Sequence, residues 1–208
     1  MQETDGKTDI LVQHTGELQR YNQAIRFFIY GQAGFYLALF VCVLLLPRGL
    51  VVNHGFTYYG ENTLTIIPFG LAFLTSGIFT LVSSLYLPRA MPFRMVKIAF
   101  WLMIPLLLAI MVTTSAVNMF LNHIHLKFGE ALFILQAVMC FWMGLIVCRN
   151  LTNYLLLLLL IISGVVSIVA VNDIIPYLIE GQVAYQLVFG LLVVHTMTRL
   201  RDRLTTDN

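Results

Sequence analysis

The amino-acid sequence predicts an all-α membrane protein, a bundle of six transmembrane helices with both termini in the cytoplasm. Six long apolar stretches contain no Asp, Glu, Lys or Arg. Hydrophobic residues make up 59% of the chain and charged residues 11%, whereas about a quarter of residues are charged in a soluble domain. The basic residues are also sorted, because ten of the twelve lie on alternate connections between the stretches. Such sorting is typical of a polytopic helical protein.

The residues before the first span, 1–24, form a charged segment that we expect to lie in the cytoplasm. It lacks an apolar core after a basic region, so we expect the first span, and not a cleavable signal peptide, to direct insertion. The part from Thr8 to Ile25 is predicted to form a short surface helix, with Leu11, Leu18 and Tyr21 toward lipid. The six-helix domain then covers 25–198, and residues 199–208 form a basic cytoplasmic tail.

The first predicted span, at 1.5 Å per residue, is long enough to cross a hydrocarbon core of about 30 Å. The predicted spans are Phe27–Leu46, Leu64–Leu87, Ile98–Leu121, Ala131–Cys148, Tyr154–Val171 and Val183–Thr198. Two of the connections, 88–94 and 149–153, are short and basic. Connections this short predict antiparallel neighbouring helices.

The distribution of basic residues predicts the orientation. One set of connections holds Lys7, Arg20, Arg26, Arg89, Arg94, Lys97, Arg149, Arg199, Arg201 and Arg203, and the other holds Arg48 and Lys127. The positive-inside rule places the first set in the cytoplasm, and we expect a multi-pass protein of the plasma (inner) membrane. Membrane lipids are the expected partners, since the net charge of +2 is too small to indicate nucleic acid.

Small residues within the spans predict close helix contacts. Gly31 and Gly34, Gly70 and Gly77, and the group Ser163, Gly164 and Ser167 lie on the first, second and fifth spans. Packing within one chain is favoured, and a homo-oligomer stays an open alternative. The three cysteines lie in apolar stretches without paired spacing, which supports neither a disulfide framework nor a zinc ribbon.

A polar collar is predicted at the outer ends of the spans. Its members are Asn53, His54, Thr57, Tyr58, Tyr59, Glu61, Asn62, Asn118, His123, His125, Glu130, Asn172, Asp173, Glu180 and Gln182. One hypothesis is a zinc site built from His54, His123, His125 and Asp173 or Glu130, because imidazole and carboxylate are usual zinc ligands and an open position activates water. The favoured interpretation is a solvated interfacial rim without a metal, in which the histidines lie at headgroup depth.

A second hypothesis is a polar cavity that opens outward. Its predicted lining is Thr113, Thr114, Ser115, Asn118, Gln136 and Gln186, with Glu61 and Glu130 nearer the surface. Polar side chains in spans generally face the bundle interior. A small-solute transporter would use such a cavity with Asp173 as its ion-binding group, but the two halves of the chain agree only loosely as an inverted repeat.

The first outer loop resembles a known family. Asn53-His54-Gly55-Phe56-Thr57-Tyr58-Tyr59-Gly60, followed by a span entered through Asn62 and Pro68, is similar to the loop of uncharacterised prokaryotic six-span proteins related to the DRAM-like superfamily. Thr57 and Gly60 match the short hydroxyl-and-glycine motif after the first span. The resemblance implies a membrane protein with no catalytic residues to carry over, some relatives being linked to lipid handling.

The sequence therefore predicts a binding, structural or lipid-handling membrane protein rather than an enzyme. No nucleophile elbow, phosphate-binding loop or zinc-protease helix occurs in it. The alternatives are a membrane-embedded metal-dependent hydrolase that uses the outer histidines and, behind it, the small-solute transporter.

Overall fold

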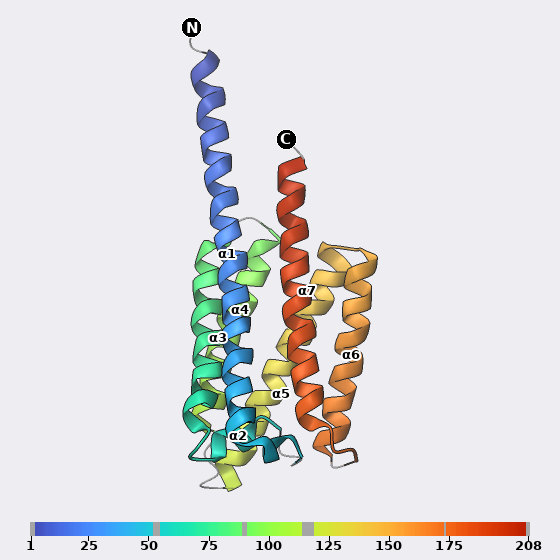
Figure 1. The fold of residues 1–208 in the computed structure, drawn as a ribbon. Helices are drawn as coiled ribbons and strands as arrows, with labels where there is room; N and C mark the ends of the chain where they lie inside the picture. Colours follow the sequence, from blue (N-terminus) through green and yellow to red (C-terminus); the bar gives the residue numbers. More distant parts are fainter. Residues whose placement is uncertain (1–2, 52–54, 89–90, 114–118, 173, 207–208) are drawn as a thin grey trace.

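The computed structural model describes residues 3–51, 55–88, 91–113, 119–172 and 174–206. These ranges are largely helical and contain no strand. Figure 1 shows the elements in order: α1 (Glu3–Leu45), the short 3-10 helix η1 (Pro47–Leu50), α2 (Thr57–Glu61), α3 (Ile66–Tyr86), α4 (Phe93–Thr113), α5 (Met119–Trp142), the π-helical turn η2 (Met143–Val147), α6 (Leu151–Val171) and α7 (Leu178–Thr206).

Six helical segments in the described part of the chain are long and apolar enough to cross a membrane, which confirms the predicted all-α fold with six spans. They are Gly16–Leu45, Ile66–Tyr86, Phe93–Thr113, His123–Val147, Leu151–Val171 and Leu178–Arg203. Both termini lie at one end of the bundle, which we call the terminal end (Figure 1). The opposite end, which carries η1 and α2, is called the loop end.

The helices pack as two groups, one of α1, α3 and α4 and the other of α6 and α7, and α5 joins them. Helix α1 packs along α3, and α3 packs against α4; α6 packs against α7. Helix α5 contacts α4, α6 and α7, and α1 also contacts α7. At the centre, the Phe28 ring of α1 stacks on Phe100 of α4 with centroids 5.2 Å apart and meets Phe189 of α7 at 6.2 Å. These three buried rings join both groups into one core.

Gly31 and Gly34 let α1 approach α3 closely, as the sequence predicts, whereas Gly70 and Gly77 of α3 make no such close contact. A Cβ atom added at Gly31 would lie 2.9 Å from Cβ of Phe79, and one at Gly34 would lie 3.1 Å from Thr75. On α6, a Cβ atom at Gly164 would lie 3.0 Å from the Phe133 ring of α5. These glycines therefore serve packing within the chain.

The structure corrects the prediction of a separate surface helix from Thr8 to Ile25. Helix α1 runs without a break from Glu3 to Leu45 and projects beyond the bundle at the terminal end (Figure 1). Tyr21 does not face lipid, since its side chain is fully buried and its hydroxyl donates to the Met197 carbonyl of α7 at 2.8 Å. The tail after residue 198 also continues as helix, and Arg201 Nη1 donates to Asn22 Oδ1 at 3.2 Å.

The boundary between the third and fourth spans also differs from the prediction. Helix α4 ends at Thr113, and residues 119–121, which we assigned to the third span, belong to α5. The predicted outer loop around residues 123–130 is therefore helical. This shift decides how His123 and His125 are presented, because helical geometry and not loop geometry now sets their directions.

Candidate functional site

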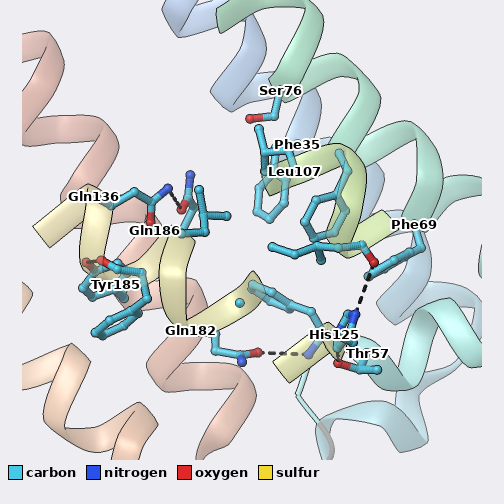
Figure 2. A pocket seen from close by; sticks show the side chains of 16 residues that line it. Phe35, Thr57, Phe69, Ser76, Leu107, His125, Gln136, Gln182, Tyr185 and Gln186 are labelled. Carbon is cyan, nitrogen blue, oxygen red and sulfur yellow. Dashed lines mark hydrogen bonds between the residues drawn. The ribbon is translucent and has the colours of Figure 1, made fainter. Parts of the chain in front are cut away.

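A cavity of about 140 Å³ lies between the two helix groups near the loop end. Its walls come from α1, α3, α4, α5 and α7, and Phe56 and Thr57 border it at the loop end (Figure 2). The lining is Phe35, Phe56, Thr57, Phe69, Phe73, Ser76, Leu107, Ile110, His125, Gly129, Leu132, Phe133, Gln136, Gln182, Tyr185 and Gln186. Among the described residues, no Asp, Glu, Lys or Arg lines this cavity.

His125 of α5 and Thr57 of α2 form one polar wall. The Nδ1 atom of His125 lies 3.2 Å from the Ile110 carbonyl oxygen, which can only accept, so Nδ1 carries the hydrogen. The Nε2 atom lies 3.0 Å from the Thr57 hydroxyl oxygen, and in the neutral ring it accepts the hydroxyl hydrogen. Both ring nitrogens of this buried imidazole are thus used in its neutral form.

The loop that carries Thr57 is held against α7 by Gln182. The Phe56 N–H donates to Gln182 Oε1 at 2.9 Å. Gly55 precedes it with φ of +62°, and a Cβ atom there would lie 2.7 Å from the same Gln182 oxygen. The left-handed backbone favours glycine, and a Cβ atom would also displace the Gln182 amide from its place. Gly55 and Gln182 therefore fix the loop over the cavity.

Tyr59 anchors the other side of this loop. Its side chain is fully buried, and a Cβ atom added at Gly49 would lie 2.6 Å from its ring. Burial raises the pKa of Tyr59 to about 12. Its hydroxyl has no hydrogen-bond partner among the described residues, so packing and not hydrogen bonding holds this ring.

A row of three glutamines crosses the bundle deeper in the membrane. Gln136 of α5 donates from Nε2 to Gln186 Oε1 of α7 at 3.0 Å, and Gln186 donates to Gln32 Oε1 of α1 at 3.3 Å. Figure 2 shows the Gln136 and Gln186 amides together at one side of the cavity. Such hydrogen bonds contribute on average about 0.6 kcal/mol each between membrane helices. The row therefore joins three helices and places amide groups at the cavity wall.

An aromatic pair forms the wall between this row and α6. The Tyr185 ring of α7 stacks on Phe133 of α5 with centroids 3.9 Å apart, and its hydroxyl donates to the Phe133 carbonyl at 2.8 Å. The tyrosine hydroxyl is thereby turned to the backbone, so the pair offers the cavity mainly ring surface.

The structure describes only part of the predicted zinc site. His54 and Asp173 lie outside the described residues. His123 is exposed whereas His125 is buried, because residues two apart on a helix point in nearly opposite directions. Among the described residues, no three His, Cys, Asp or Glu side chains come together as metal ligands would. The zinc site stays a prediction.

Most residues of the predicted polar cavity lie within the part of the chain that the structure describes. Gln136 and Gln186 come together at its wall. Glu130 is exposed and pairs with Lys127 at 2.8 Å, and Glu61 is exposed on α2. Thr113 lies beside His125, with Oγ1 3.3 Å from Nδ1. Asn118, like Thr114 and Ser115, lies outside the described residues.

Sequence reasoning missed Gln32, Ser76 and Tyr185 and placed Gln182 only in the surface collar. A signal existed for two of these residues. Gln182 and Gln186 are four apart on one helix and so share a face, and Gln32 lies in the interior of the first span. Ser76 and Tyr185 gave no signal, since serine and tyrosine are common in membrane helices.

The chemistry of the site favours binding over catalysis. Thr57 and His125 have the hydrogen bond of a nucleophile and its base. However, a backbone carbonyl and not a carboxylate orients the ring at Nδ1, and the neighbouring Phe56 N–H is already donated to Gln182. Neutral amide, imidazole and hydroxyl groups set among aromatic rings are suited to hold an uncharged polar group.

The chain was compared with family models, curated proteins and solved structures, and no match was found in any of the three.

Proposed function

We propose that this chain is an integral membrane protein that binds an amphiphile with a small uncharged head, and so has a lipid-handling role. The observation that carries the proposal is the lining of the cavity near the loop end. It combines glutamine amides, a neutral imidazole and a hydroxyl with aromatic walls, and none of its described members is charged.

The amide groups have hydrogen-bonding capacity to spare. Each glutamine side chain has two donor hydrogens and an oxygen with two lone pairs. Gln136 and Gln186 use part of this capacity on each other and on Gln32. A hydroxyl-bearing head can therefore exchange hydrogen bonds with the row, whereas an ionised head would enter without a counter-charge and lose its hydration.

The size of the cavity limits the head. A cavity of about 150 Å³ accepts benzene, and this one has about 140 Å³. It is thus large enough for about six non-hydrogen atoms, as in a glycerol group, and smaller than the roughly 300–1,000 Å³ of pockets for drug-sized ligands. The rest of an amphiphile must lie elsewhere.

With the orientation that the basic residues predict, this cavity lies in the outer half of the membrane. The sorted basic residues support a cytoplasmic terminal end, by the positive-inside rule. In the plasma (inner) membrane, the loop end and the cavity then face the outer leaflet. Membrane lipids are the partners that the proposal requires.

Thermal unfolding of the detergent-purified protein tests the proposal with two probes of equal chain length, a monoacylglycerol and the corresponding fatty acid. A ligand that binds only the folded state raises the unfolding temperature in a concentration-dependent way. We expect the monoacylglycerol to stabilise the wild type and the ionised fatty acid to have no effect. The double variant Gln136→Leu with Gln186→Leu should lose this stabilisation, and Glu61→Gln, at an exposed position, should keep it.

Equal stabilisation by both probes, or none by the monoacylglycerol, contradicts the proposal. The metal-dependent hydrolase is the alternative, and elemental mass spectrometry of the same preparation tests it. Stoichiometric zinc that disappears in a His54, His123 and His125 triple alanine variant would favour the hydrolase over lipid binding.

A further inference from the structure

A second hollow lies between α3 and α4 and has a different character. It has a volume of about 180 Å³, and its lining comes from Phe73 to Leu81 of α3 and from Ile104 to Met111 of α4. All of its lining residues are apolar or glycine. Ile78 and Leu108 line it with 55% and 46% of their surface exposed, so the hollow is a groove that opens toward lipid.

The groove and the polar cavity share a boundary. Phe73 of α3 and Leu107 of α4 line both of them. Figure 2 labels Leu107 among the side chains that line the polar cavity. Side chains of this kind change rotamer far more readily than helices move. Because Phe73 and Leu107 line both hollows, side chains and not a helix separate them.

Gly77 keeps the groove open. A Cβ atom added there would have Leu107 Cδ1 as its nearest neighbour, at 3.9 Å, which is ordinary contact distance. Gly31 and Gly34, by contrast, are in tight contact with α3. Gly77 is thus not required for helix packing, and its missing side chain leaves space that a larger residue would fill.

We propose that the groove between α3 and α4 holds the hydrocarbon chain of the amphiphile whose uncharged head occupies the polar cavity, with the chain passing between Phe73 and Leu107. The proposal rests on the proposed function and names the second half of its ligand. An all-apolar hollow at membrane depth offers water no partners, so hydrocarbon fills it. Phe73 and Leu81 are eight residues apart, about 12 Å along the helix, and they lie on either side of the middle of α3. The groove therefore covers a substantial part of a hydrocarbon core of about 30 Å.

Photo-crosslinking tests the path of the chain. The full-length protein is placed in phosphatidylcholine nanodiscs with a monoacylglycerol that carries a diazirine in the middle of its acyl chain. After irradiation, labelled peptides are identified by mass spectrometry, with and without excess unlabelled monoacylglycerol. We expect competable labelling within residues 73–81 and 104–111.

Gly77→Leu should reduce this labelling to the level left by the excess unlabelled probe, because the leucine side chain fills the groove. Gly70→Leu is the matched control, since Gly70 lies two turns away on nearly the same face of α3 and has no atom within 4 Å of an added Cβ. It should label like the wild type. Unfolding temperatures equal to that of the wild type show that both variants keep the fold.

The remaining outcomes separate the two proposals. Labelling spread over other helices, absent altogether, or unchanged in Gly77→Leu overturns the groove as the site of the chain. Competable labelling in the groove that persists in Gln136→Leu with Gln186→Leu leaves the chain site standing and contradicts the polar cavity as the head site. Both proposals are supported if labelling is lost in Gly77→Leu and also in the double variant Gln136→Leu with Gln186→Leu, while Gly70→Leu labels like the wild type.

Discussion

At the residue scale, Gly55 controls how the loop closes over the polar cavity. Its φ of +62° strains any other residue, and a Cβ atom 2.7 Å from Gln182 Oε1 would push that amide away from the loop. Gly55→Ala should therefore destabilise the protein by about 1–3 kcal/mol, from left-handed strain together with the weakened Phe56–Gln182 hydrogen bond. Unfolding of the purified protein in detergent measures the change.

Gly70→Ala serves as the control for this substitution, because an added Cβ atom there meets nothing within 4 Å. It should be neutral or stabilising, by up to about 1 kcal/mol from helix propensity. If Gly55→Ala is as stable as this control, the loop does not depend on the left-handed conformation.

Single residues also show where sequence reasoning reached the site and where it stopped. Gln136 and Gln186 could be predicted as cavity residues, because polar groups inside membrane spans avoid lipid. The pairing of His125 with Thr57 could not. It depends on the rotation of α5 and on the placement of a loop about seventy residues earlier in the chain, and no local pattern encodes that distance.

At the scale of elements, the contact between α1 and α3 depends on Gly31. Its added Cβ atom would lie 2.9 Å from Cβ of Phe79, and neither atom can move away by a side-chain rotation. Gly31→Ala should separate the two helices and cost about 1–3 kcal/mol of stability. Unfolding in detergent tests this against Gly16→Ala on the same helix, where an added Cβ atom meets nothing within 4 Å. Equal losses in both variants would contradict close packing at Gly31.

Element boundaries were less predictable than element existence. Apolar length predicted six spans, but it placed the end of the third span inside what is α5 and treated residues 8–25 as a separate surface helix. Hydropathy changes where a helix leaves lipid, whereas the helix itself continues as long as its backbone hydrogen bonds do. Tyr21 illustrates the difference, since it is buried by α7 and not by lipid.

At the scale of the whole molecule, the charge distribution predicts a testable orientation. Glu61 and Thr152 are exposed at opposite ends of the bundle. In a variant without Cys42, Cys140 and Cys148, all of which are buried free thiols, Glu61→Cys should react with a membrane-impermeant maleimide in intact cells. Thr152→Cys should react only after the membrane is permeabilised. The reverse pattern would mean that the terminal end faces outward and that the cavity lies in the cytoplasmic half.

The amino-acid sequence by itself determined the fold class, the number of spans and an expected orientation, because these follow from properties that add along the chain: apolar length and the position of charge. Only the tertiary structure decided that three glutamines from three helices meet, that His125 turns inward while His123 is exposed, and that Phe73 and Leu107 divide a polar cavity from an apolar groove. These features depend on the rotation and tilt of each helix about its neighbours. In a membrane, where lipid is as apolar as most side chains, packing contacts rather than hydropathy set that rotation.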